Sequence, residues 1–94
     1  MQGIITVPKE TIGQVHFYKE EVLNNEESRK VRQYFLLRAQ TLGNLYHQKV
    51  NIVYLLRNGE IQQVETTVWA VEEDYIVLKG GVTIPVHAIL EIEF

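Results

Sequence analysis

The hydrophobic pattern of this chain changes its period at Lys49, and that change limits the fold more than any other feature. Before Lys49, apolar side chains recur every three or four residues, as they do on one face of a helix. After Lys49, β-branched and aliphatic runs are separated by turn signals at Asn58–Gly59 and Gly80–Gly81. The sequence therefore predicts one helix followed by several short strands.

The predicted helix runs from about Glu26 to Leu42, inside a helical region of residues 24–46. Asn24 and Asn25 are both favourable N-cap residues, and the two glutamates that follow them place negative charge where the helix dipole favours it. Gly43 belongs to a residue type that often ends a helix. Both ends of the helix are therefore indicated by the sequence.

One stripe of this helix is apolar and is predicted to face the core. Its members recur at spacings of 4, 4, 3 and 4, and they are Val31, Phe35, Ala39, Leu42 and Tyr46. The polar side, which is predicted to face water, consists of Arg29, Arg32, Gln33 and Gln40.

Five strands are predicted after the helix, at residues 49–57, 60–73, 75–79, 82–87 and 88–94. The turns between the first four strands are short, and they contain Asn58–Gly59, the acidic residues up to Asp74, and Gly80–Gly81. Neighbouring strands are therefore expected to pair in an antiparallel sense.

Two of these strands carry a further signal. In the second strand, the apolar residues change phase between Ile61 and Val64, which predicts a bulge or a sharp bend there. In the last strand, apolar residues alternate with glutamates, as in a half-buried strand. The predicted buried side consists of Leu90, Ile92 and Phe94, and the predicted exposed side of Glu91 and Glu93.

Five short antiparallel strands leave two bare edges if they form a flat sheet. We therefore expect them to bend strongly and close into a small barrel, with the helix covering one end. Residues 1–23 are expected to form an N-terminal arm, with a strand at 3–7 and an extended or mixed segment at 11–23. The chain is predicted to be one domain of residues 1–94, made of this arm, the helix at 24–46 and the barrel at 47–94.

Three stretches of the strand region resemble the Sm-like (LSm/Hfq-like) family of small β-barrels. They are VNIVYLLRNG at 50–59, YIVLKGG at 75–81 and IPVHAILEIEF at 84–94. The resemblance implies a mainly β fold in which one helix precedes a strongly bent, five-stranded antiparallel barrel of the Sm-like or SH3-like type. The N-terminal arm expected at residues 1–23 has no counterpart in the family. The resemblance also implies RNA binding by a ring of subunits, in which the fourth strand of one subunit pairs with the fifth strand of the next.

Three neighbouring positions bear on what this resemblance implies. His87 stands where the family contacts a nucleotide base. Val86 stands where RNA-binding members carry a lysine, so the charge that would neutralise phosphate is missing. Pro85 lies in the fourth strand, where proline suits an edge but offers no N–H to a ladder between subunits.

Composition and charge narrow the classes of function. The net charge is −3, and because residues 49–94 hold four more acidic than basic side chains, the barrel region disfavours a phosphate backbone. The chain has no cysteine, and its three histidines share no ligand spacing, so we expect no metal and no cofactor. The N-terminus is unlike a signal peptide and the longest apolar run has five residues, so we expect a cytoplasmic protein without membrane attachment.

Two sets of candidate contact residues follow. The candidate contacts to a nucleic acid or a partner are His87, Arg29, Lys30, Arg32 and Arg38, and the candidate edge-strand interface consists of Thr83, Pro85 and His87. For His87 the alternative is a partly exposed residue at a strand end that bonds a backbone group. For the four basic residues the alternative is a solvated helix surface. Trp69 and Tyr54 are the aromatic residues best suited to stack on a base, although Trp69 is expected to lie in the core.

No pattern points to catalysis. Ser28 is the only serine and suits helix capping, and Asp74 is the only aspartate and lies in a turn, with no nucleophile elbow in the chain. Glu91 and Glu93 are better explained by a solvated strand face than by an acid–base pair. We therefore expect a non-catalytic interaction module that binds a protein or another copy of itself through its edge strands, its helix or its N-terminal arm. The alternative is an Sm-like RNA-binding ring.

Overall fold

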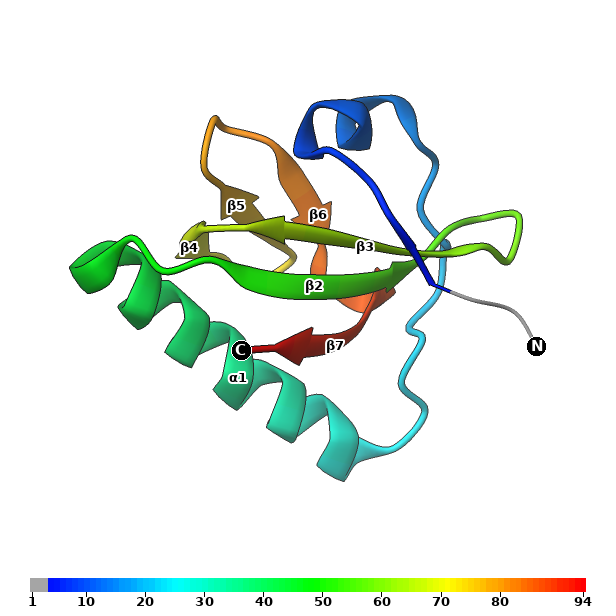
Figure 1. Ribbon diagram of the computed structural model, residues 1–94. Coiled ribbons are helices and arrows are strands. Elements are labelled where there is room, and N and C mark those ends of the chain that lie inside the picture. The colour runs from blue at the N-terminus through cyan, green and yellow to red at the C-terminus, as the bar shows by residue number, and fades with distance from the viewer. Residues whose placement is uncertain (1–3) are drawn as a thin grey trace.

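The computed structural model describes residues 4–94 as a compact mixed α/β domain with one α-helix and two β-sheets (Figure 1). In chain order, the elements are β1 (Ile5–Thr6), the 3₁₀ helix η1 (Lys9–Gln14), α1 (Glu26–Tyr46), β2 (Val50–Leu55), β3 (Ile61–Thr66), β4 (Val68–Val71), β5 (Tyr75–Leu78), β6 (Thr83–Pro85), the 3₁₀ turn η2 (Val86–Ala88) and β7 (Ile89–Glu93). The expected order of an arm, one helix and a strand-rich region is confirmed.

The strands form two sheets, with the orders β1-β3-β2-β7 and β4-β5-β6. All neighbours are antiparallel except β1 and β3, which are parallel. The expected closed, five-stranded antiparallel barrel is therefore not found among residues 4–94. The ladder is interrupted at Thr67, between β3 and β4, and the turn η2 stands between β6 and β7. The prediction of a bulge or bend between Ile61 and Val64 was wrong. The long predicted strand is interrupted at Thr67 instead.

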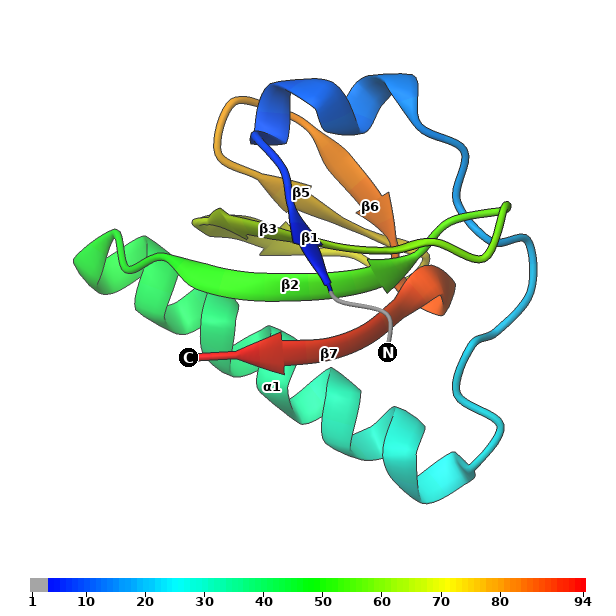
Figure 2. The same ribbon diagram turned by 45° about the vertical axis from the view of Figure 1, so that its right-hand side comes forward.

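Two helical elements cover the places where the sheets are not hydrogen-bonded to each other. α1 packs against β4 and β7, and η1 packs against β3 and β6. They lie on opposite sides of the strands (Figures 1 and 2). Leu36 of α1 and Ile12 of η1 enter the same buried cluster as side chains from both sheets. Apolar packing thus closes the core where backbone pairing does not.

The N-terminal arm is part of the folded core. The predicted strand at 3–7 is reduced to β1, which pairs with β3 through Ile5 and Thr6, while Gly3 lies outside the described residues. The segment expected to be extended or mixed at 11–23 begins inside η1 and then runs as irregular chain. It bonds to the end of β2 through a bridge between Phe17 and Leu56.

The start of α1 agrees with the sequence, and its end agrees with the helical region of residues 24–46, but its buried face does not. The Asn25 side chain accepts a hydrogen bond from the Ser28 N–H at 3.2 Å, as a cap should. The helix continues past Leu42 to Tyr46 and ends at His47, which has a left-handed φ of 54°. The buried residues are Arg32, Leu36, Ala39 and Gly43, whereas Val31 and Tyr46 of the predicted stripe are exposed.

Gly43 does not end the helix but allows it to approach β4 closely. A Cβ atom at this position would collide with the Val68 carbonyl oxygen and would lie 2.9 Å from the Thr67 Cγ2 atom. One turn earlier, the Gln40 side chain accepts a hydrogen bond from the Val71 N–H at 2.5 Å. The close approach at Gly43 and the hydrogen bond to Gln40 thus hold the helix against the outer edge of β4.

The inward face of β7 also differs from expectation. β7 buries Ile89 and Ile92, which are three positions apart, because its pairing with β2 shifts register between Val53 and Tyr54. Phe94, which follows the end of β7, is exposed. β3 buries Gln62, Val64 and Thr66. Among the described residues, no helix has both the length and the apolar character that crossing a lipid bilayer requires.

Candidate interaction site

A cavity of about 700 Å³ lies between the first half of α1, the turn before β5 and the β6–η2 segment. It brings together five of the candidate contact residues named from the sequence, which are Arg29, Arg32, Thr83, Pro85 and His87. The remaining lining side chains are Glu21, Gln33, Glu73, Asp74, Tyr75 and Val86. We call this the β6 cavity.

One wall of the β6 cavity is an open strand edge. Backbone bonds from the Leu78 N–H to the Val82 oxygen and from the Val86 N–H to the Asp74 oxygen place Val82 and Val86 in the bonded set of the β5–β6 ladder. Bonded and non-bonded pairs alternate in an antiparallel ladder. The backbone groups of Thr83 and Pro85 therefore point away from β5. Because proline has no N–H, the Thr83 N–H is the outward-pointing backbone donor of this pair of residues.

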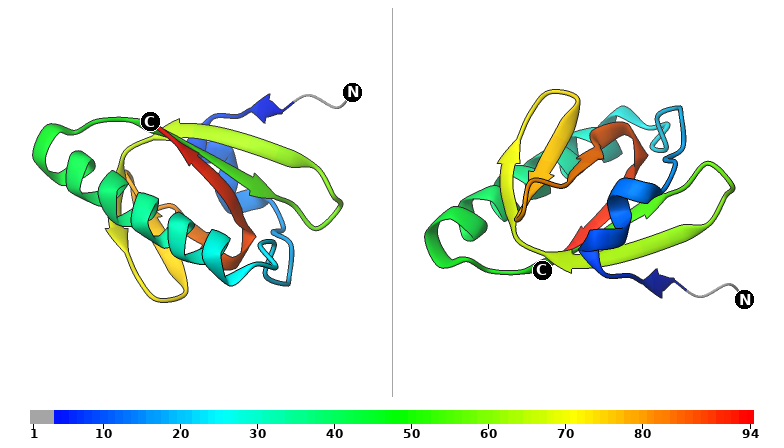
Figure 3. Two further views of the ribbon diagram at one scale, coloured as in Figure 1. Left: turned by 90° about the horizontal axis from the view of Figure 1, so that it is seen from below. Right: turned by 90° about the horizontal axis from the view of Figure 1, so that it is seen from above.

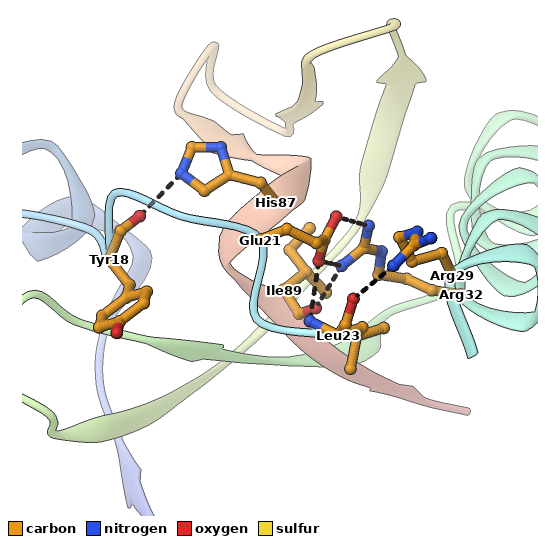
Figure 4. A network of polar contacts seen from close by, with 7 residues as sticks. All are labelled: Tyr18, Glu21, Leu23, Arg29, Arg32, His87 and Ile89. Carbon is orange, nitrogen blue, oxygen red and sulfur yellow. Dashed lines mark hydrogen bonds and ion pairs between the residues drawn. The ribbon is translucent and has the colours of Figure 1, made fainter. Parts of the chain in front are cut away.

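Next to this edge, a salt bridge holds Arg32 of α1 to Glu21 of the preceding segment (Figure 4). Both terminal nitrogens of the guanidinium donate to the carboxylate at 2.7 Å, and Nη1 also donates to the Ile89 oxygen at 3.0 Å. Arg32 is only 6% exposed, so its predicted position in water was wrong. The hydrogen bonds from Arg32 lower the pKa of Glu21, and partial burial opposes that shift.

His87 and Arg29 fasten the same preceding segment, Tyr18–Leu23, which we call the clasp. The His87 ring Nε2 lies 2.7 Å from the Tyr18 oxygen, and its backbone oxygen accepts from the Val22 N–H at 2.9 Å. The Arg29 guanidinium donates to the Leu23 oxygen at 2.9 Å (Figure 4). His87 lies in η2 rather than in a strand. Its ring bonds a backbone group, as the alternative interpretation of this residue expects.

Lys30 and Arg38 lie away from the β6 cavity. The Lys30 ammonium is 3.5 Å from the Glu26 carboxylate on an exposed turn of α1. The Arg38 guanidinium lies 5.0 Å from the centre of the Phe94 ring, which also contacts Phe35 edge-on. Of the four helix cations, Arg29 and Arg32 therefore share the β6 cavity, whereas Lys30 and Arg38 have other surroundings.

The two candidate stacking residues are placed differently from expectation. Trp69 was expected in the core but is exposed, at the register shift of the β4–β5 pair. Tyr54 is buried in β2, where its hydroxyl donates to the Gln62 Oε1 atom at 3.1 Å. Burial raises the pKa of Tyr54 to about 12. Of the two aromatic residues, only Trp69 presents a face to solvent.

The side chains considered for catalysis are dispersed. Ser28 lies in the capped first turn of α1, and Asp74 lines the β6 cavity. Glu91 and Glu93 lie on the exposed side of β7, where a hydrogen bond with the Glu93 carboxyl raises the pKa of Glu91. Among residues 4–94, no group of three or more His, Cys, Asp or Glu side chains is arranged to hold a metal ion.

Sequence reasoning missed the clasp because Glu21 and Arg32 are eleven positions apart and in different elements. One signal was available. Arg32, Leu36, Ala39 and Gly43 follow one another at spacings of 4, 3 and 4, which is a helical face with one cation in it. A cation on such a face needs a buried acceptor, and the acidic segment just before the helix offers one.

The fold and this cavity define a small mixed α/β domain with an open strand edge. Comparison with protein-family models, with curated proteins and with solved structures found no match to this chain.

Proposed function

We propose that this protein is a non-catalytic interaction module of the Sm-like or SH3-like small-barrel type. It receives an extended segment of a protein partner, or of a second copy, along the β6 edge. The observation that carries this proposal is the outward-pointing backbone of Thr83 and Pro85 beside a cavity of about 700 Å³. Strand addition at an exposed edge is an established mode of peptide recognition, in which main-chain hydrogen bonds give affinity and neighbouring pockets give specificity.

The strand order supports the barrel type in this proposal. If β3 and β4 are taken as one strand interrupted at Thr67, the strands follow the order β7-β2-(β3/β4)-β5-β6, which is a five-stranded meander with the last strand returned beside the first. The helix covers the side where β4 and β7 lie. The short edge strand β6, with its proline, is a typical way to limit uncontrolled pairing while keeping an edge open.

The surroundings of the cations favour a protein partner over RNA. Arg32 is neutralised by Glu21, Arg29 is bonded to a carbonyl oxygen, and the cavity also contains Glu73 and Asp74. A site that binds phosphates depends on cations that can replace counterions. An Sm-like RNA-binding ring therefore remains the second candidate, and the test below distinguishes the two.

A photo-crosslinking residue at position 83, introduced into the full chain in cells, tests the proposal. We expect adducts with protein at position 83 and few at Asn58, the matched control at the exposed tip of the β2–β3 hairpin. Mass spectrometry identifies each adduct as a second copy, another protein or RNA. RNA adducts, or yields at position 83 no higher than at Asn58, would contradict the proposal.

The role of the Thr83 N–H can be tested separately with the crosslinking residue at Gln33, on the opposite wall of the β6 cavity. Thr83→Pro removes the outward donor without breaking a bond to β5, and a net hydrogen bond is worth about 1 kcal/mol. We expect the adduct yield to fall about fivefold in Thr83→Pro and to stay unchanged in Thr83→Val, which keeps the N–H. Equal yields in the two variants would show that the partner does not use this edge.

A further inference from the structure

The helix α1 carries a second apolar stripe on the side that faces away from the sheets. Val31, Tyr34, Arg38, Thr41 and Leu45 follow one another at spacings of 3, 4, 3 and 4, which is the pattern of a helix–helix seam. Val31 is 47% exposed, Tyr34 64% and Leu45 65%. Seen from below, α1 lies across the molecule with no other element in front of it (Figure 3).

Beside this seam lies Phe94, which is 48% exposed and whose ring centre is 5.0 Å from the Arg38 guanidinium. If an aromatic side chain carries about 200 Å² of surface, Tyr34 and Phe94 together expose on the order of 200 Å². With Val31 and Leu45, the patch falls within the roughly 300–600 Å² that a typical monomer exposes. It is smaller than the roughly 800 Å² that each partner buries in a standard interface, so the contact it supports is of modest affinity.

The charged residue inside the seam does not prevent contact. The Arg38 guanidinium is drawn to the Phe94 ring at 5.0 Å, which itself packs on Phe35 toward β7. The charge is therefore displaced to one flank. The methylene groups of Arg38 can then cover apolar surface in the seam.

The charges at the two ends of α1 determine the direction in which a second helix fits. Glu26 and Glu27 lie in the first turn, and Lys49 follows the end of the helix. Glu26 already faces Lys30, whereas Glu27 makes no salt bridge within residues 4–94. In an antiparallel pair of copies, Glu27 of each would lie toward Lys49 of the other, and the helix dipoles would oppose each other. A parallel pair would place like charges together.

We propose that two copies of this chain associate through α1, with the helices antiparallel and with Val31, Tyr34 and Leu45 at the centre of the contact. If the two-fold axis passes beside Arg38, Val31 of one copy lies opposite Leu45 of the other, because both lie seven positions from Arg38, and each Arg38 guanidinium is turned aside toward its own Phe94 ring. This deepens the proposed interaction function by naming one partner, a second copy, and it rests on that function. The β6 cavity faces a different side of α1 and stays open in the pair.

Sedimentation equilibrium and light scattering on the purified full chain, over a wide concentration range, test this proposal. We expect a reversible monomer–dimer equilibrium for the wild type. In Leu45→Glu we expect the dimer Kd to rise about a hundredfold, because each dimer loses the buried Leu45 side chain twice. Asn44→Glu introduces the same charge on the same turn but outside the seam, and should leave the Kd within about threefold of the wild type. Circular dichroism should show equal folding in both variants.

A charge exchange tests the direction of the helices. Glu27→Lys and Lys49→Glu should each weaken the dimer severalfold, and the double variant should regain wild-type affinity. Weakening by the single variants without recovery in the double variant would overturn the antiparallel arrangement. A wild type that stays monomeric up to millimolar concentration, or a dimer unaffected by Leu45→Glu, would overturn the use of this face. In either case, adducts to another protein at position 83 would show that the proposed function survives.

Discussion

Gly43→Ala is expected to lower the free energy of unfolding by about 3 kcal/mol or more, which is at the upper end of the usual cost of overpacking. The added methyl group would collide with the Val68 carbonyl oxygen, and backbone cannot rotate out of the way as a side chain can. The helix must then move away from β4, which also stretches the bond between Gln40 and the Val71 N–H. Urea denaturation followed by circular dichroism gives the free energies.

Gly13→Ala is the matched control for this experiment. It adds the same methyl group to the other helical element, and no atom lies within 4 Å of the position that the new Cβ would occupy. Its φ angle is not in the left-handed region, so we expect a change within about 0.5 kcal/mol of zero or a small gain in stability. If Gly43→Ala were as well tolerated as Gly13→Ala, the close approach of α1 to β4 would be wrong.

Glu21→Ala is expected to cost about 3 kcal/mol, because it leaves the buried Arg32 guanidinium without its counterion. The Leu23 N–H, which bonds to the same carboxylate at 2.9 Å, loses its acceptor as well. Glu20→Ala is the matched control, since Glu20 is the exposed preceding residue and should change stability by less than about 0.5 kcal/mol. Urea denaturation of both variants at neutral pH measures the difference.

The double variant Glu21→Ala/Arg32→Met shows whether the buried charge causes the loss. Replacing a buried ion pair by apolar groups is often nearly neutral, so the double variant should be more stable than Glu21→Ala alone. A double variant less stable than Glu21→Ala would contradict this explanation. It would mean that Arg32 stabilises the fold through its bond to the Ile89 oxygen rather than through Glu21.

The same pair gives a pH dependence of defined sign. Because folding lowers the pKa of Glu21 from 4.5, the folded state binds fewer protons than the unfolded state in the acid range. The stabilisation is therefore present in full above pH 4.5 and is lost as the pH falls through the lowered pKa. The stability difference between the wild type and Glu21→Ala should be constant above pH 4.5 and should narrow below it.

The sequence predicted the positions of the helix and the strands better than it predicted which of their faces are buried and whether the strands close into a barrel. Asn25 marked the start of α1 correctly, since a cap is a local hydrogen bond that depends on adjacent residues. The buried face was wrong because α1 is apolar on two sides, and periodicity cannot say which stripe packs inward. Leu36 and Leu45 are equally apolar, but one is buried and the other exposed because of where β4 and β7 lie.

For the candidate site, the positions were predictable but their surroundings were not. Thr83 and Pro85 were expected at an edge because proline excludes itself from the interior of a sheet, and β6 is an edge strand. Arg29, Lys30, Arg32 and Arg38 were treated as one basic cluster because they are close in the sequence. Lys30 pairs within the helix with Glu26. Arg32 and Arg38, however, find their partners, Glu21 and Phe94, outside the helix, and spacing along the helix does not specify such contacts.

The parallel contact between β1 and β3 has a consequence for the order of folding. Ile5 pairs with Gln62, so the arm and its partner strand are separated by more than half of the chain. Closing so long a loop carries an entropic cost that must be met before the arm gains any contact. β1 should therefore dock last, onto an already assembled set of later strands. Its amides should be among the first strand amides to exchange with deuterium in the native protein.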